Sequence, residues 1–107
     1  MKVLFSAEAS DLLETLPEVL PEKVYFNFEK DAAKYAKTLA DDIARHLPYK
    51  ERRVAPRRYA KYSEGLLYAV FTTNKRMSWY VFFHAYMYDN ETVFVVDHLT
   101  NNRRFVF

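Results

Sequence analysis

The fold is decided by three stretches of sequence: LLYAVFTT at positions 66–73, MSWYVFFHAYM at 77–87 and ETVFVVDH at 91–98. All three are rich in aromatic and β-branched side chains, which suit the packed surface of a β-sheet. The gaps between them, 74–76 and 88–90, are short and polar, and gaps of that length connect antiparallel neighbours. The sequence therefore predicts three consecutive strands in an antiparallel meander.

Upstream of the meander, the pattern predicts a short strand and then a helix. Residues 2–5 alternate weakly, and we expect them to form a strand at a sheet edge or beside the last hairpin. Ser6 can cap a helix that starts at the next residue. We expect this helix to end near Leu16, because Pro17 lacks a donor and clashes with the preceding turn. Residues 17–23 are then expected to form a turn.

A second helix is predicted after the N-cap residue Asn27, and Pro48 is expected to stop it. Its apolar side chains recur at helical spacing: Phe28, Ala32, Tyr35, Ala36, Leu39, Ile43 and Leu47. Helices that precede a run of strands favour an α+β fold of two layers, with the helices on one face of the sheet. We therefore predict a two-layer α+β fold in the order β-α-α-β-β-β.

Alternation along the middle strand divides its side chains between two faces. One set resembles a helix-covered core and comprises Trp79, Val81, Phe83, Ala85 and Met87. The other set comprises Tyr80, Phe82, His84 and Tyr86. A face of aromatic rings can stack exposed bases or form a groove for a partner protein, and it can also be ordinary packed structure.

Length and composition exclude several classes of protein. A chain of 107 residues corresponds to one domain, which we place at 1–107. The chain has no cysteine, which excludes disulfides and thiolate sites, and its three dispersed histidines show no ligand spacing, so neither a metal nor a cofactor is expected. No apolar run approaches the roughly 20 residues of a membrane span, and the N-terminus does not resemble a signal peptide. We expect a cytoplasmic protein without membrane contact.

The net charge of +2 hides an uneven distribution. Residues 1–44 carry five lysines against nine acidic residues, whereas 45–107 carry eleven basic residues against five acidic ones. The basic residues before the meander are Lys50, Arg52, Arg53, Arg57, Arg58 and Lys61, and Arg103 and Arg104 follow it. Arginine suits phosphate because its planar group donates two parallel hydrogen bonds. The segment is either a solvated loop or a surface that binds nucleic acid or an acidic protein.

The order of elements resembles the RelE/ParE superfamily of toxins from bacterial toxin–antitoxin modules. Three segments carry the resemblance: RYAKY at 58–62 leading into GLLYAVF at 65–71, WYVFF at 79–83, and VFVVDH at 93–98 with the arginine tail. The resemblance covers most of the chain in layout. It implies a type II toxin that a cognate antitoxin wraps and blocks. In that family the concave sheet face and the basic segment engage the ribosome and mRNA, or DNA gyrase in the ParE branch.

If the chain is a RelE-like endoribonuclease, it needs a base for the 2′-hydroxyl proton, cations for the charged phosphorane and an acid for the leaving oxygen. His98 is the candidate for proton transfer, because histidine titrates near neutral pH. Arg103 and Arg104 are candidates to clamp the phosphate after a turn at 99–102, and Lys50, Arg52, Arg53, Arg57, Arg58 and Lys61 are candidates to bind the nucleic-acid backbone. His98 could equally be a structural histidine at a strand end.

Two departures from the family pattern keep other functions open. RelE-like nucleases usually carry an arginine on the strand after the glycine, where Leu67 and Ala69 stand here, and many end with a catalytic Tyr or His, whereas this chain ends FVF. A toxin that inhibits DNA gyrase without catalysis, or a nucleic-acid-binding domain outside the family, therefore remains an alternative.

Overall fold

The three predicted strands are antiparallel neighbours in the computed structural model of the protein. They are β3 (Leu67–Asn74), β4 (Met77–Tyr88) and β5 (Glu91–Asn101). The structure describes residues 1–22, 29–62, 64–74 and 77–101. The predicted meander is confirmed, and the main change is that β5 continues three residues beyond His98.

Short edge strands complete a five-stranded mixed sheet in the order β1-β5-β4-β3-β2. Strand β1 (Lys2–Phe5) runs parallel to β5, beside the last hairpin as expected. Strand β2 (Arg53–Val54) pairs antiparallel with the start of β3 and was not predicted. Two residues inside a charged segment carry no periodicity that sequence analysis can detect.

The first helix, α1 (Ala7–Glu22), is longer than predicted, because it continues through Pro17 and Pro21 instead of ending near Leu16. A proline removes the hydrogen-bond donor at its own position only, and a helix whose neighbouring turns are held can bend there without ending. Ser6 caps the helix as predicted: its Oγ accepts a bond from the backbone N–H of Ala9 at 3.1 Å.

The second helix, α2 (Glu29–His46), ends where the sequence predicts, and a 3₁₀ turn η1 (Leu47–Tyr49) contains Pro48. The predicted N-cap Asn27 lies outside the described residues. A second 3₁₀ turn, η2 (Arg57–Tyr59), lies in the basic segment between β2 and β3.

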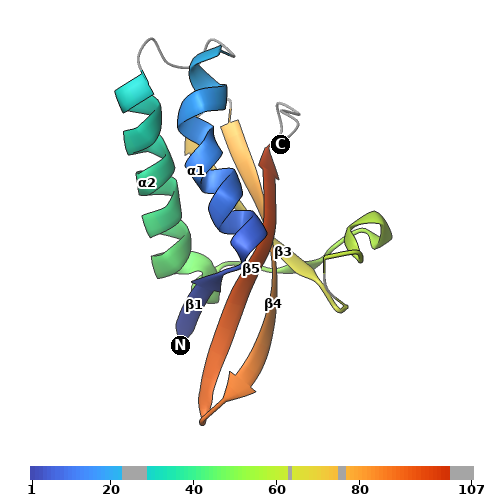
Figure 1. Ribbon diagram of the computed structural model, residues 1–107. Helices are drawn as coiled ribbons and strands as arrows, with labels where there is room; N and C mark the ends of the chain where they lie inside the picture. The colour runs from blue at the N-terminus through green and yellow to red at the C-terminus, as the bar shows by residue number, and fades with distance from the viewer. Residues whose placement is uncertain (23–28, 63, 75–76, 102–107) are drawn as a thin grey trace.

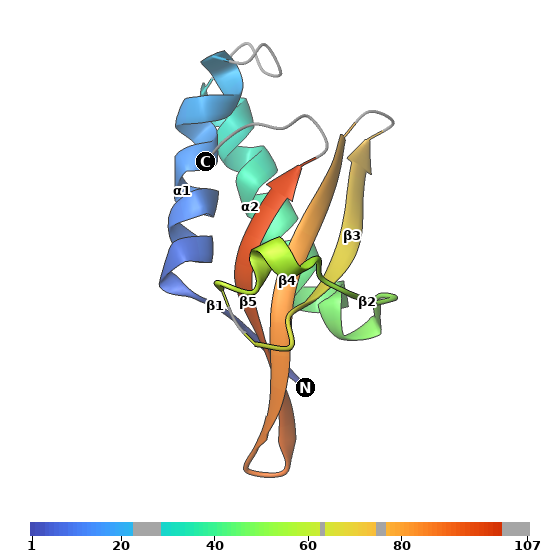
Figure 2. The same cartoon turned by 90° about the vertical axis from the view of Figure 1, so that its right-hand side faces the viewer.

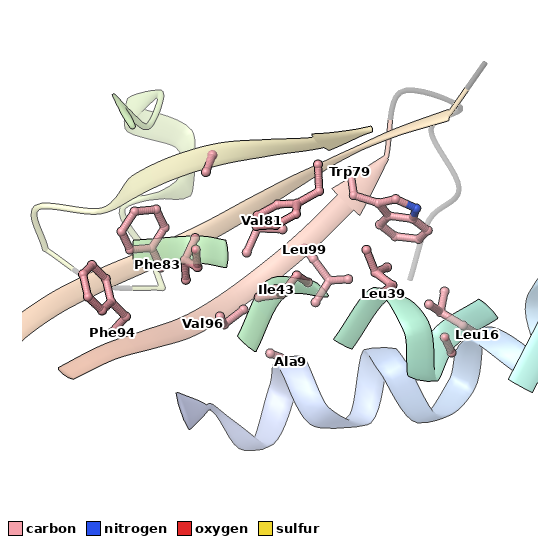
Figure 3. Packing of buried hydrophobic residues seen from close by; sticks show 14 of the residues in the cluster. Ala9, Leu16, Leu39, Ile43, Trp79, Val81, Phe83, Phe94, Val96 and Leu99 are labelled. Atoms are coloured by element: carbon pink, nitrogen blue, oxygen red, sulfur yellow. The ribbon is translucent and has the colours of Figure 1, made fainter. Parts of the chain in front are cut away.

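Both helices pack on one face of the sheet, which gives the α+β arrangement of two layers (Figure 1). Figure 3 shows Leu16, Leu39 and Ile43 of the helices meeting residues of the sheet. Trp79 is fully buried among them, and its indole N–H donates to the Tyr35 hydroxyl of α2 at 2.7 Å. This bond satisfies the one polar group of the indole and joins sheet to helix inside the core.

The hairpin between β4 and β5 extends past the ends of the helices (Figure 1). Its turn residues Asp89 and Asn90 have φ of 51° and 62°, as a two-residue turn of type I′ requires. Because neither α1 nor α2 covers this part, Met87 is 66% exposed, and the prediction that Ala85 and Met87 belong to the core face was wrong. Alternation sets the side of a side chain, but the length of the helix layer sets its burial.

We expect Trp79→Ala to lower the free energy of unfolding by about 3–5 kcal/mol, the range for emptying a large buried aromatic site. Tyr88→Ala is the control, because Tyr88 is 71% exposed on the hairpin and should change stability by about 0.5 kcal/mol or less. Urea denaturation followed by circular dichroism measures both. Equal effects of the two substitutions would contradict the core assignment.

Candidate functional site

The face of the sheet opposite the helices is crossed by η2 and the residues after it, which lie in front of β4 and β5 in Figure 2. We call this side, which α1 and α2 do not cover, the open face. Its side chains from the sheet include Arg53, Tyr68, Tyr80, Phe82, His84, Tyr86 and His98. One row of paired positions runs across the sheet from β2 to β5 and comprises Arg53, Tyr68, Phe82 and His98. Paired positions point to the same side, so one row joins an arginine, two aromatic rings and a histidine.

Two tyrosines from the basic segment cover the centre of this row. Tyr59 stacks on Phe82 with ring centroids 4.2 Å apart, and Tyr62 stacks on His98 at 4.4 Å with the planes 9° apart. Phe82 is only 3% exposed as a result, so it is not an open platform for a base. Over Phe82 and His98, the aromatic surface that meets solvent is formed by Tyr59 and Tyr62, both half-buried, and Tyr86 on the same face is 44% exposed.

The tyrosine cluster was missed by sequence analysis, although a signal for it exists. In the run RRYAKY at 57–62 each tyrosine directly follows a cation, and the two tyrosines are three residues apart. In the structure Arg58 lies 5.0 Å from the centre of the Tyr59 ring and Lys61 lies 5.2 Å from that of Tyr62. Cations held over aromatic faces keep positive charge at this surface.

The predicted basic residues divide into two groups. Arg53, Arg57, Arg58 and Lys61 are exposed in β2, in η2 and just after it. Lys50, which is half-buried, and Arg52, which is itself exposed, lie over rings of the core: Lys50 Nζ is 4.6 Å from the Phe71 centroid, and the Arg52 guanidinium is 5.4 Å from that of Phe94. Arg52 also donates to the Pro48 carbonyl at 3.1 Å. These two cations therefore cover the end of the core.

A bulge in β5 brings His98 to the open face. Phe83 pairs with Val96 and Phe82 with His98, so Asp97 is an extra residue in the ladder. Strict alternation would have turned His98 towards the helices. The signal in the sequence is a change of parity, because the buried apolar positions shift from Val96 to Leu99.

His98 has a charged partner from the helix layer. Its Nδ1 lies 3.3 Å from Oε2 of Glu8 in the first turn of α1, and its side chain is 13% exposed. Burial lowers the pKa of His98 below its ordinary value of 6.5, Glu8 opposes this change, and Lys61 adds to it. The imidazole is therefore mainly neutral near pH 7, which is the form that accepts a proton.

A second histidine on the open face is paired more closely. Nδ1 of His84 lies 2.6 Å from Oδ2 of Asp97, the bulged residue, and the Asp97 side chain is 10% exposed. The His84 ring also stacks beside Tyr86 with centroids 6.1 Å apart. Sequence analysis placed His84 and Tyr86 on one face but missed the pairing of His84 with Asp97, because the register between two strands cannot be read from alternation alone.

The turn predicted before the arginine tail is not formed by residues 99–101. Leu99 and Asn101 belong to β5 and pair with Val81 and Trp79, so residues 99–101 are strand and the predicted turn at 99–102 was wrong. The physical reason is that Leu99 is fully buried in the core, which holds the strand in its ladder beyond His98. Arg103 and Arg104 themselves lie outside the described residues.

Within the part of the chain that the structure describes, no group of three or more His, Asp or Glu side chains is arranged to hold a metal ion. In the same residues, no helix has the length and apolar character needed to cross a membrane. Comparison with models of known protein families, with characterised proteins and with solved structures gave no match.

The pKa of His98 should be measurably below 6.5 in the folded protein. Between the pKa of His98 in the folded protein and the ordinary value of 6.5, the unfolded chain binds more protons at this residue than the folded chain does. The contribution of His98 to the free energy of unfolding therefore rises with pH across this window. NMR titration of the imidazole measures the pKa. Glu8→Gln should lower it further, because a favourable charge is lost, and Lys61→Gln should raise it. A pKa above 6.5 in the unaltered protein would contradict the assignment.

Proposed function

We propose that the protein is a toxin of the RelE/ParE type that cleaves mRNA on the ribosome and is neutralised by a cognate antitoxin. The observation that carries the proposal is the open face, where a mainly neutral histidine, stacked aromatic rings and exposed cations occur together. The α+β arrangement, with two helices packed on one side of a mixed sheet, is compatible with the resemblance in the sequence.

The chemistry of RNA cleavage matches these groups. The neutral imidazole of His98 accepts the proton of the 2′-hydroxyl as that oxygen attacks the phosphorus. Arg58 and Lys61, held over Tyr59 and Tyr62, bind the phosphate backbone, and bases contact the exposed edges of the two tyrosine rings. In this proposal Arg53 binds the backbone further along the row.

The arginine tail keeps a role in the proposal through sequence alone. Arg103 and Arg104 follow the last residue of β5 by two and three positions, and their charge would add to the clamp on the phosphate. Residues 99–101 are strand and not the predicted turn, so the proposal depends first on the cations of the basic segment.

One observation favours a toxin that binds DNA gyrase without catalysis. Tyr62 covers one face of His98 in parallel stacking, and Glu8 contacts its Nδ1, which is also what a structural histidine would show. In that case the open face is a protein-binding surface, and His98 supports its shape. The two functions differ in what fails first in the cell, translation or DNA replication.

The test of function is induced expression without antitoxin, followed by mapping of mRNA cuts and measurement of replication. We expect cuts in ribosome-bound mRNA, and we expect His98→Ala to slow cleavage by about 10²–10⁴-fold, as loss of a general base does. Arg58→Gln should mainly weaken RNA binding and flatten its salt dependence. His46→Ala on α2 is the matched control. Intact mRNA with blocked replication, and a His98→Ala variant that stays toxic, would favour gyrase.

The antitoxin should cover the cations of the open face with an acidic segment. Complementary charges on two partners speed their association, and salt weakens this effect. We therefore expect replacement of Arg57, Arg58 and Lys61 by glutamine to slow association, as measured by surface plasmon resonance at several salt concentrations. Lys37→Gln on the exposed side of α2 is the control. An association rate that ignores both salt and the triple substitution would contradict this interface.

A further inference from the structure

His84 and Asp97 form a dyad with a fixed proton arrangement. A carboxylate can only accept, so at 2.6 Å from Asp97 Oδ2 the Nδ1 atom of His84 carries the hydrogen. Nε2 is then the ring nitrogen left to exchange a proton with a ligand. The His84 side chain is 30% exposed, so a ligand on the open face can reach the ring.

The position of the dyad is set by the fold and not by a flexible loop. Asp97 occupies the bulge of β5, and its backbone carbonyl accepts a bond from Ser6 Oγ at 3.3 Å. Its carboxylate is largely buried, and His84 is the partner that compensates for this burial. Bulges commonly re-aim a side chain beside an active site.

The dyad lies next to His98 on the same face. His98 pairs with Phe82, and His84, two residues further along β4, pairs with Val95, so the two histidines lie on either side of the bulge on the same face. In a regular ladder, positions displaced by two residues are about 7–8 Å apart, so two side chains near such positions can both contact one phosphodiester above the face. Two proton-transfer groups on opposite sides of one phosphate are what cleavage of RNA by its own 2′-hydroxyl requires.

We propose that His84 is the general acid of the reaction and that Asp97 is its positioning residue. The proposal rests on the endoribonuclease function proposed above. His98 takes the 2′-hydroxyl proton while the 2′-oxygen forms a bond to phosphorus. The bond from phosphorus to the 5′-oxygen breaks, and protonated His84 donates the Nε2 proton to that oxygen. The products are a 2′,3′-cyclic phosphate and a free 5′-hydroxyl, and no co-reactant is needed.

A substrate whose leaving group needs no proton distinguishes a general acid from a residue that only supports the structure. Loss of the acid no longer slows its cleavage, whereas loss of a structural residue still does. We would place a 5′-bridging phosphorothiolate at the mapped cut in mRNA bound to the ribosome. A thiol has a pKa of about 8.5, so it departs as thiolate without an acid. On ordinary mRNA, His84→Ala should slow cleavage by about 10²–10⁴-fold. On the phosphorothiolate it should come within about tenfold of the unaltered protein. His98→Ala should stay slow on both.

Asp97→Asn should slow cleavage of ordinary mRNA less than His84→Ala does. Its rate should recover in part on the phosphorothiolate. The matched control is His46→Ala, which removes another His–Asp pair of 2.6 Å on α2 and should leave both rates unchanged. If His84→Ala is equally slow on both substrates, or normal on ordinary mRNA, the dyad proposal is wrong while the nuclease function stands. If the unaltered protein cuts neither substrate, both proposals fall. Circular dichroism confirms that each variant is folded.

Discussion

The bulge at Asp97 is the constraint on which the two faces of the sheet depend. One extra residue in β5 lets Val96 and Leu99 both face the helices, although they are three positions apart. The same residue turns His98 to the open face. Without the bulge, the chain could not place both Val96 and Leu99 in the core, because side chains of a strand alternate strictly.

The bulge is held from both sides of the sheet. Ser6 connects it to the start of α1: its N–H donates to the Val96 carbonyl at 2.8 Å, and its Oγ contacts the Asp97 carbonyl and also caps the helix. On the open face His84 pairs with the Asp97 carboxylate. A buried carboxylate without such a partner would be costly, so the register of β5 and the dyad support each other.

The fold followed from local signals where the sequence is periodic. The aromatic strands and α2 were predicted within a few residues, because each repeats its apolar side chains at the period of its own structure. The errors fell where a longer-range effect decides. Pro17 predicted an end that α1 does not have, and Met87 was assigned to a core that the helices do not reach. Local rules describe neither the support that packing gives a helix nor the length of a neighbouring layer.

By itself the sequence determined which residue types occur together: a strand-rich aromatic half, an acidic helical half and a basic segment between them. It also identified His98 as a candidate and placed His84 with Tyr86 on one face. Only the tertiary structure decided that Tyr62 lies on His98, that Glu8 contacts it, and that Asp97 pairs with His84. These contacts join residues 13 to 90 positions apart or depend on one bulged residue, and the periodicity of a sequence carries no information about such pairings.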